Sequence, residues 1–405
     1  MPGKDIGVES VAFHRKNRGK LAVASKVDCG NREGLSLAYT PGVAAVCMEV
    51  GKNPDAAYDL TCKWNTVAVV SDGTRVLGLG NIGPLAALPV MEGKAVLFKA
   101  FGGVDAFPIC LSCKKEDEIV KAVENIAPSF GGINLEDIES PKCFEVERKL
   151  IERLDMPVFH DDQHGTAVVA LAGLVNALKV VGKGKDAKIV VSGAGAAGIA
   201  IVKLLHAAGF SNLAVCDSSG ILVDSEKLPP YKREVAKICG SEKAGSLADA
   251  LVGADALIGV SAPNIIGEKE VRKMAGKPIV FALSNPIPEI APDEAKRAGV
   301  AVFGTARSDL PNQVNNVLGF PGIFRGALLV RAQRISEGMK LAASYALAES
   351  AGKVSKDRIL PLPFEKGVVG KVASAVALEA QKSGGARLRM SAREIEEELA
   401  KLGIG

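Results

Sequence analysis

The most informative run for the fold of this chain is Lys188-Ile189-Val190-Val191-Ser192-Gly193-Ala194-Gly195-Ala196-Ala197-Gly198. Its apolar first half is typical of a buried parallel strand, and the segment that follows, ending near Gly209, has the pattern of a helix. Glycines spaced G-x-G-x-x-G between a strand and a helix are the fingerprint of a dinucleotide-binding unit. We therefore expect this loop to bind a pyrophosphate through Gly193, Ala194, Gly195, Ala196, Ala197 and Gly198.

Each glycine of this loop is required for a different physical reason. Gly193 permits the tight turn, Gly195 lets the backbone approach a pyrophosphate, and Gly198 lets the helix pack closely on the strand. Asp217 ends the next apolar run and is placed to accept hydrogen bonds from the adenosine ribose. It favours NAD, because a 2′-phosphate would face a carboxylate. No Arg follows at positions 218–220, but the serines there can also receive a phosphate, so the sequence leaves NADP open.

Strand-like and helix-like runs alternate around the loop. A long helix is predicted over residues 166–181, and the strand candidates are residues 189–191, 213–216, 256–260, 278–283 and 300–303. Near-continuous apolar strands separated by helices predict an α/β fold with a doubly wound parallel sheet.

The rest of the sequence predicts a second domain and a helical end. Residues 1–160 mix short apolar runs with Gly and Pro turns, which is typical of a smaller α/β domain. We assign residues 161–385 to the Rossmann-type domain, whose end is helix-rich, and residues 386–405 to a last helix. Ser391 and Glu394 form a capping-box signal for that helix.

Length and charge exclude several classes of function. The chain has 405 residues and a formal net charge of +4, from 50 Lys and Arg against 46 Asp and Glu, so no basic field would attract nucleic acid or an anionic membrane. The N-terminus lacks the apolar core of a signal peptide, and the longest apolar stretch, residues 167–175, is interpreted as part of a buried helix. Eight cysteines without a framework pattern suit a reducing compartment, so we expect a cytoplasmic protein. The Cys110–Cys113 pair is interpreted as two ordinary thiols.

Carboxylates are concentrated in two short runs, Asn134-Leu135-Glu136-Asp137 and His160-Asp161-Asp162-Gln163-His164-Gly165-Thr166. Four acids near one site repel one another, so a positive group must hold them together. Carboxylates are hard oxygen ligands, and a set of them without Cys or paired His suits Mg²⁺ or Mn²⁺ rather than Zn²⁺. Simpler interpretations are a solvated turn for Glu136-Asp137, and the N-cap of a helix beginning near Gly165 for Asp161-Asp162.

Seven motifs follow one another along the chain: residues 37–44 (LAYTPGVA), 71–83 (SDGTRVLGLGNIG), 92–94 (EGK), 136–137 (ED), 161–166 (DDQHGT), 283–286 (LSNP) and 315–317 (NNV). Together they resemble the malic enzyme family in its short prokaryotic form, and the resemblance extends to about residue 380. It implies oxidative decarboxylation of L-malate to pyruvate and CO₂, with reduction of NAD or NADP and dependence on Mn²⁺ or Mg²⁺.

The resemblance also implies a role for each matching residue. Tyr39 would be the general acid that protonates the enol carbon, and Lys94 would bind substrate and be the base that takes the C2 hydroxyl proton. Asp161 would orient Lys94. The implied metal ligands are Glu136, Asp137 and Asp162. A lysine acts as a base near neutral pH only if its pKa is depressed, and we expect desolvation and the nearby dication to do this for Lys94.

Three more residues complete the implied substrate site. Arg75 would hold a malate carboxylate, although a surface ion pair is a common alternative for an Arg. Asn285 and Asn315 would contact the substrate or the nicotinamide end of the cofactor. Asn285 closes a predicted strand, so it should lie at the carboxyl edge of the sheet. Asn316 is the alternative to Asn315.

Other functions and the assembly stay open at this point. A malolactic-type reaction, with tightly bound NAD and lactate as product, is the close alternative to oxidative decarboxylation. An amino-acid dehydrogenase or a nucleotide sensor would share the two-domain plan but would not need the metal acids or the proton-transfer groups. Short members of the family are expected to be homodimers, with an active site near the interface.

Overall fold

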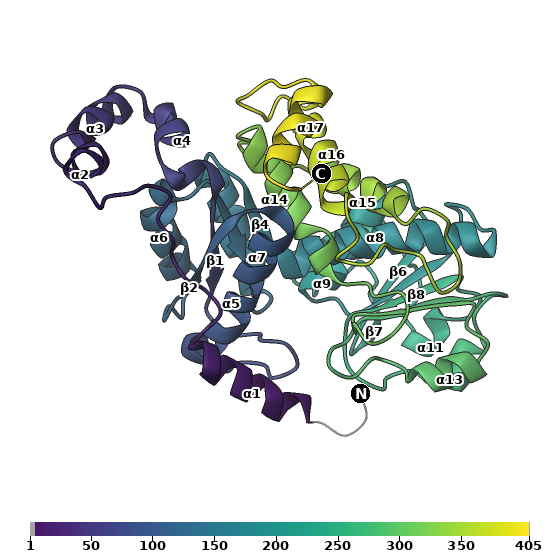
Figure 1. Ribbon diagram of the computed structural model, residues 1–405. Coiled ribbons are helices and arrows are strands. Elements are labelled where there is room, and N and C mark those ends of the chain that lie inside the picture. Colours follow the sequence, from purple (N-terminus) through teal and green to yellow (C-terminus); the bar gives the residue numbers. More distant parts are fainter. Residues whose placement is uncertain (1–4, 405) are drawn as a thin grey trace.

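Two sheets organise the chain. The computed structural model, which describes residues 5–404, contains a four-stranded and a six-stranded sheet side by side (Figure 1). The four-stranded sheet has the order β2-β1-β3-β4 and is parallel throughout. Its strands are β1 (Thr66–Ser71), β2 (Asp105–Cys110), β3 (Gly132–Leu135) and β4 (Val158–His160).

Helices cover both faces of this smaller sheet. They are α5 (Gly83–Gly102), α6 (Glu116–Ile126), the 3₁₀ turn η3 (Ala127–Ser129) and α7 (Lys142–Arg153). Alternate residues of a strand point to opposite faces, so Val67 and Val69 of β1 pack in the cluster that contains α5. Ala68 and Val70 pack instead against α6 and α7. This burial on both faces explains why β1 is apolar along its whole length.

The six-stranded sheet has the order β10-β9-β8-β5-β6-β7. All neighbours are parallel except β7, which runs antiparallel to β6. The strands are β5 (Ile189–Ser192), β6 (Leu213–Asp217), β7 (Gly220–Ile221), β8 (Ala256–Gly259), β9 (Ile279–Ala282) and β10 (Val302–Thr305). The chain moves outward from β5 in both directions, so the strand order reverses between β5 and β8, where doubly wound folds bind ligands. The predicted α/β doubly wound fold is confirmed, with strand ends within two residues of those expected.

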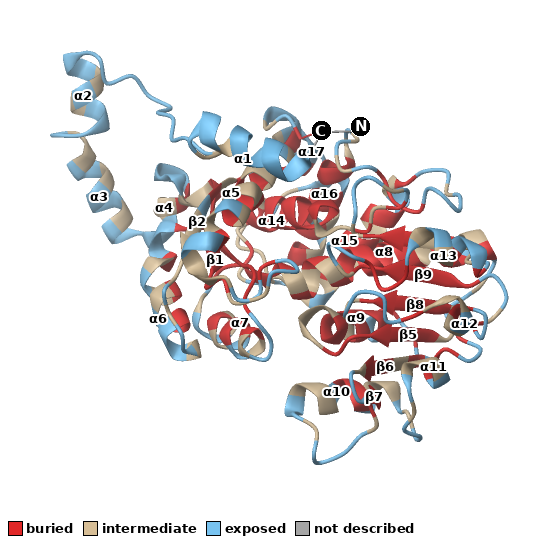
Figure 2. Cartoon of the chain, turned by 90° about the horizontal axis from the view of Figure 1, so that it is seen from below, coloured by how far each residue is buried: buried red, intermediate tan, exposed pale blue. Residues whose placement is uncertain are grey.

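The helices of this second unit are α8 (Asp161–Val181), α9 (Ala196–Ala207), α10 (Pro230–Cys239), α11 (Leu247–Ala250), α12 (Glu268–Val271) and α13 (Pro292–Arg297). Within residues 5–404, α8 alone has the length and apolar composition that crossing a membrane would require. Most of α8 is buried inside the protein, because it packs between α9 and α15 (Figure 2). The prediction of a buried helix is confirmed, but its expected start near Gly165 is wrong. The helix begins at Asp161 and its N-cap is His160.

The C-terminal part is helical and joins the two sheets. It consists of η4 (Asn316–Leu318), α14 (Phe320–Leu329), α15 (Glu337–Ser350), α16 (Val368–Lys382) and α17 (Ala392–Lys401). Phe320 of α14 packs on Phe98 of α5 with ring centroids 4.7 Å apart, and the buried Arg325 donates to the carbonyl of Gly102 at 2.9 Å. The capping box of Ser391 and Glu394 on α17 is present as predicted.

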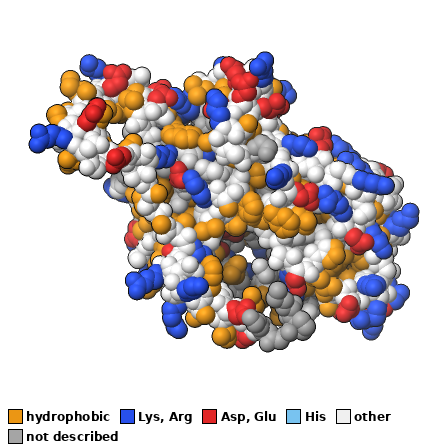
Figure 3. Space-filling view, in the orientation of Figure 1, with side chains coloured by type: hydrophobic (Ala, Val, Ile, Leu, Met, Phe, Trp, Pro, Cys, Tyr) orange, Lys and Arg blue, Asp and Glu red, His pale blue; other side chains and the backbone are white. Residues whose placement is uncertain are grey.

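The N-terminal helices stand apart from this body. They are α1 (Ile6–Asn17), α2 (Arg32–Ala38) and α3 (Val43–Lys52), followed by η1 (Pro54–Ala56), α4 (Ala57–Leu60) and η2 (Cys62–Asn65). None of the residues of α1, α2 and α3 is buried, and α2 and α3 project from the four-stranded unit as an arm (Figures 1 and 2). Large apolar side chains are exposed on this arm (Figure 3). Among them, Leu37 is 71% exposed and Met48 is 64% exposed.

Candidate active site

The acidic residues lie at the carboxyl edge of the four-stranded sheet. Glu136 and Asp137 directly follow β3, and Asp161 and Asp162 directly follow β4. Because β3 and β4 are parallel neighbours, the residues that follow them emerge side by side. The structure thus brings together the two acidic runs that lie far apart in the sequence.

Lys94 is the positive group among these acids. It lies on α5 and is 7% exposed. Its Nζ contacts Asp161 Oδ2 at 2.5 Å and Glu136 Oε1 at 2.8 Å. The ammonium also lies over the ring of Phe320, 4.2 Å from the centroid. A buried ammonium is tolerated only with such opposite charges around it, so these contacts fix the position of the Lys94 side chain.

Burial and mutual repulsion shift the titration of the acids. Burial raises the pKa of Glu136 well above its usual value, with further contributions from the neighbouring aspartates. Burial and the charge of Asp162 raise the pKa of Asp137 to about 8. Burial works to lower the pKa of Lys94, but Asp161 and Glu136 outweigh it and raise that pKa. The expected depression of the Lys94 pKa is therefore not produced by the protein groups alone.

The position of the Asp161 carboxylate depends on a nearby glycine. Gly165 is one helical turn further along α8, and a Cβ built on it would lie 1.8 Å from Asp161 Oδ1. Any larger residue at this position would therefore push the carboxylate away from Lys94. This requirement explains why a glycine follows the acids within the first turns of the helix.

The acids have free oxygens that fit a hard cation. Asp137 Oδ2 and Asp161 Oδ1 are buried and accept no hydrogen bond in the described part of the chain. Asp162 Oδ2 accepts from the backbone N–H of Asp137 at 2.8 Å, which joins the two acidic runs. Within residues 5–404, however, no three Asp, Glu, His or Cys side chains already surround one point as a metal site would require. The donor set suits Mg²⁺ or Mn²⁺, while the space between Glu136 and Asp161 is occupied by the Lys94 ammonium.

The glycine loop has the geometry expected for a dinucleotide. Gly193 has a φ of +114°, and a Cβ on it would lie 2.7 Å from the carbonyl oxygen of Val260. A Cβ on Gly198 would lie 1.7 Å from the carbonyl oxygen of Gly193, so the helix could not start so close to the strand. Gly195 is the N-cap of α9. The turn and packing reasons predicted for Gly193 and Gly198 are thereby confirmed.

Asp217 has a partner that the sequence analysis did not identify. Its Oδ2 lies 2.6 Å from Lys232 Nζ on α10, and its Oδ1 accepts from the N–H of Ser219 at 2.8 Å. No Lys or Arg directly follows Asp217 in the sequence, and Lys232 reaches it from the next helix. A positive charge therefore does lie beside Asp217.

Loops that follow strands of the two sheets meet at the carboxyl edges of these sheets. Ser140 lies at the dinucleotide loop: its Oγ would be 3.7 Å from a Cβ on Gly195. A Cβ on Gly78 would lie 2.9 Å from the carbonyl oxygen of Asn285, so the loop after β1 touches the loop after β9. Ser140 is a candidate cofactor contact that the sequence analysis missed, and its position three residues after Asp137 is the signal that could have indicated it.

Comparison with known proteins gives these features a family. The malic enzyme N-terminal domain matches residues 18–151, and the malic enzyme NAD binding domain matches residues 163–307 and 300–382. The chain belongs to the malic enzyme family. It is 53% identical over 402 residues to a bifunctional malic/malolactic enzyme from Bacillus subtilis, covering 98% of each chain. It is 54% identical to an NAD-dependent malic enzyme from Geobacillus stearothermophilus, covering 95% of this chain and 81% of the relative.

Solved structures agree with this assignment. The crystal structure of a malic enzyme from Pyrococcus horikoshii is 50% identical and superposes with a TM-score of 0.94, covering 98% of this chain and 96% of that one. The predicted family and two-domain malic enzyme architecture are therefore confirmed.

Arg75, Asn285 and Asn315 of this malic enzyme lie in the loops that follow β1, β9 and β10. Arg75 is exposed, and its backbone N–H donates to the carbonyl of Asp137 at 3.0 Å, which places Arg75 beside the acids. Asn285 is exposed in the loop after β9. Asn315 uses its side chain locally, accepting from Val317 N at 3.0 Å and donating to the carbonyl of Ala306 at 3.3 Å. Asn316, the alternative, lies against the first turns of α8, because its Cβ would be 3.2 Å from a Cβ on Gly165.

Tyr39 is the one expected residue that the structure does not bring to the site. It is the C-cap of α2 on the projecting arm and is 67% exposed. Lys94 is buried, and its described contacts are Asp161, Glu136 and Phe320, not Tyr39. Within one copy of the chain, Tyr39 therefore does not complete the acid–base set.

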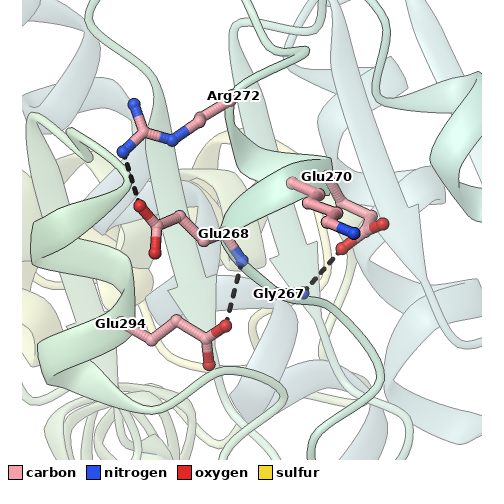
Figure 4. A pocket seen from close by; sticks show the side chains of 6 residues that line it. Gly267, Glu268, Glu270, Arg272 and Glu294 are labelled. Carbon is pink, nitrogen blue, oxygen red and sulfur yellow. Dashed lines mark hydrogen bonds and ion pairs between the residues drawn. The ribbon is translucent and has the colours of Figure 1, made fainter.

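A surface hollow elsewhere has no part in this site. Gly267, Glu268, Glu270, Arg272 and Glu294 line it together with Lys269, between α12 and α13 (Figure 4). Several of its groups already bind one another: Arg272 contacts Glu268 at 2.5 Å, and Glu294 accepts from the Glu268 N–H at 3.0 Å. The junction between the carboxyl edges of the two sheets is therefore the candidate active site.

Proposed function

We propose that this malic enzyme catalyses the oxidative decarboxylation of L-malate to pyruvate and CO₂, reducing NAD or NADP in a reaction that requires Mn²⁺ or Mg²⁺. One observation carries the proposal: a buried lysine, Lys94, is held by two carboxylates at a sheet edge that faces a dinucleotide loop. A nucleotide-binding protein without this chemistry would have no need to bury that charge. An amino-acid dehydrogenase would have no need of the acids beside it.

The chain's own residues divide the reaction between them. Lys94 takes the proton of the C2 hydroxyl while hydride leaves C2 for the nicotinamide, and Asp161 holds the Lys94 side chain in position. Arg75 binds a substrate carboxylate, and Asn285 and Asn315 contact the substrate or the nicotinamide. A cation held by Glu136, Asp137 and Asp162 would polarise the C2 oxygen and supply an electron sink for decarboxylation. Tyr39 returns a proton to C3 after CO₂ leaves.

Both nicotinamide cofactors fit the ribose end of the site. Asp217 accepts hydrogen bonds from an unmodified ribose, as NAD requires. Lys232, at 2.6 Å from Asp217, neutralises this carboxylate and can turn toward a 2′-phosphate, as NADP requires. Relatives named NAD-dependent and NADP-dependent are both similar to this chain, in agreement with either choice.

We also propose that the protein is a homodimer in which each arm of α2 and α3 covers the partner. The arm has no buried residue in a single copy and exposes Leu37 and Met48, so it lacks the burial that stabilises such short helices. Docking on a second copy would bury these side chains. It would also allow Tyr39 of one copy to reach the acids of the other.

The proposal is tested with the purified protein and L-malate. NAD and NADP are compared, each with Mn²⁺ and with a chelator, by following the absorbance of the reduced nicotinamide. We expect reduction of the cofactor only when malate and the metal are both present. Turnover that survives complete chelation would exclude the metal-dependent reaction.

A malolactic-type reaction is the second candidate. It is favoured by the 53% identity to a bifunctional malic/malolactic enzyme over nearly the whole of both chains. In that reaction the reduced cofactor stays bound and pyruvate is reduced to lactate. Lactate formed from malate without accumulation of free reduced cofactor would establish this alternative, whereas pyruvate formed together with reduced cofactor would establish the first.

A further inference from the structure

Glu147 is a buried carboxylate that the proposed reaction does not use. It lies on α7 and is 6% exposed. Its Oε1 accepts from the backbone N–H of His160 at 2.9 Å. Its Oε2 faces the side-chain nitrogens of Gln163 and His164, each at 3.0 Å. All three partners belong to the junction of β4 and α8, the segment that carries Asp161 and Asp162.

These contacts with Glu147 supply the N-terminal cap that the N-cap residue of α8 does not provide. His160 is the N-cap residue, but its side chain makes no capping hydrogen bond. In a capping box the residue three positions after the N-cap reaches back to the N-cap N–H, and Gln163 occupies that position here. Glu147 takes this N–H instead, coming from another helix, and also accepts from the Gln163 amide. The first turn of α8 is thus held by a side chain of another helix, α7.

A second link runs from this turn to the C-terminal helices. His164 Nε2 faces Glu147, while its Nδ1 lies 3.3 Å from Nζ of Lys340 on α15. Lys340 is itself paired with Glu337 at 2.7 Å. Against the effect of burial, the charge of protonated His164 and the hydrogen bonds from His164 and the His160 N–H lower the pKa of Glu147 to about 2. A negative charge at the start of a helix also interacts favourably with the helix dipole.

We propose that Glu147 is a positioning residue that sets the direction of the Asp161 and Asp162 side chains by clamping the first turn of α8. The inference rests on the proposed function, in which Asp162 binds the cation and Asp161 holds Lys94. The clamp is needed because Asp161 has little freedom: its carboxylate must fit against Gly165 and reach Lys94 at 2.5 Å. A small rotation of this turn would break that contact and move Asp162 away from Asp137.

The test measures binding of Mn²⁺ alone, without malate or nucleotide, by titration calorimetry. Glu147→Leu removes all three contacts and should raise the Mn²⁺ Kd about 10- to 100-fold, the range found when residues that orient metal ligands are replaced. Glu147→Gln keeps the shape and one acceptor, so its Kd should rise less. Glu152→Gln is the matched control, since Glu152 is an exposed residue of the same helix, paired with Arg148. NAD and NADP affinities should stay unchanged in all three variants.

A purely structural role predicts a different result. It would lower the melting temperature of Glu147→Leu but leave the Mn²⁺ Kd and kcat of the folded variant at wild-type values, and that outcome would overturn the proposal. If Glu147→Leu does not fold, an unchanged Mn²⁺ Kd in Glu147→Gln overturns it equally. Failure of the proposed function would give a different result. The wild type would then bind Mn²⁺ with a Kd that still depends on Glu147, but it would not oxidise malate.

Discussion

At the scale of single residues, Lys94 shows how closely charge and position are linked in this site. An ammonium that is 7% exposed is stable only because Asp161 and Glu136 lie within 2.8 Å. The same contacts keep Lys94 protonated until other groups enter the site. Its action as a base therefore depends on what binds beside it.

Replacement of this lysine tests its role directly. Lys94→Ala should lower kcat for malate oxidation at least about 10³-fold, because it removes the proton acceptor for the C2 hydroxyl. Nucleotide binding, measured by titration of the cofactor fluorescence, should survive. Lys99→Ala is the control, since Lys99 lies on the same helix but is exposed and pairs with Asp105. Near-normal turnover in Lys94→Ala would refute the role as base.

Lys232 should decide how well the protein accepts NADP. Without it, the 2′-phosphate would face the bare carboxylate of Asp217, so Lys232→Ala should raise KM for NADP about 10- to 100-fold, the value of a lost charge-assisted contact. KM for NAD should change much less. Steady-state kinetics with both cofactors measure the effect, and Lys237→Ala on the exposed face of α10 is the control. Equal changes for NAD and NADP would contradict this assignment.

Asp137 gives the metal-free protein a predictable pH dependence. Burial and Asp162 raise its pKa to about 8, above the unfolded value of about 3.9. The folded state therefore retains a proton that the unfolded state releases, so this contribution to stability is complete below about pH 4 and is lost as the pH rises through about 8. Asp137→Asn has no ionisable carboxyl group at this position, so it avoids this loss of stability.

We expect Asp137→Asn to raise the melting temperature of the metal-free protein by roughly a few degrees at about pH 8, and by less at about pH 5. Differential scanning calorimetry in the presence of a chelator measures both values. Added Mn²⁺ should stabilise the wild type more than the variant. If Asp137→Asn changed the melting temperature equally at both pH values, the pKa of Asp137 would not be raised in the folded protein, and this prediction would be wrong.

At the scale of elements, the first turn of α8 carries more of the site than any other segment. It begins directly at the end of β4, so it projects two acids over the edge of the smaller sheet. Gly165 gives Asp161 its space, and Asn316 of η4 packs on the same turn. One short segment therefore connects the acids, the lysine and the C-terminal helices.

Gly165→Ala tests this geometry with a single methyl group. The added Cβ would lie 1.8 Å from Asp161 Oδ1, so the carboxylate must rotate away from Lys94. We expect kcat to fall about 10²-fold or more while the helix itself is stabilised by its higher propensity. Gly276→Ala is the control, because a Cβ there meets no atom within 4 Å. A fully active Gly165→Ala enzyme would mean that Asp161 does not need this position.

At the scale of the whole molecule, the projecting arm separates Tyr39 from the remaining acid–base residues. The body of the chain contains the two sheets and the helices between them, while α2 and α3 extend away from it (Figure 1). Exposed apolar residues on short helices are typical of a surface that another chain covers. The proposed homodimer follows from this arrangement.

Mixing two inactive variants tests the dimer and the origin of Tyr39 together. If Tyr39 acts on the partner's site, a dimer of one Tyr39→Phe copy and one Lys94→Ala copy contains one intact site. Random exchange in an equal mixture should then restore up to about a quarter of the wild-type activity. The two variants assayed separately are the controls. An inactive mixture whose mixed dimers are confirmed by mass spectrometry would show that Tyr39 acts within its own copy or not at all.

The sequence was sufficient for features that depend on local patterns. Apolar runs of strand length and the glycine spacing at 193–198 predicted the doubly wound sheet, because period and turn geometry act over a few residues. The family motifs identified the acids, Lys94 and Tyr39, and the chain indeed belongs to that family. The start of α8 was misplaced, since the N-cap role was given to the acids when His160 holds it.

Tertiary structure alone decided which of these residues meet. The pairing of β3 with β4 brings the two acidic runs together, and α5 inserts Lys94 between them. Lys232 reaches Asp217 from another helix, Glu147 reaches α8 from α7, and Tyr39 stays on the arm. Contacts of this kind depend on the packing of whole elements, in which burial of apolar faces fixes positions that no local pattern in the chain specifies.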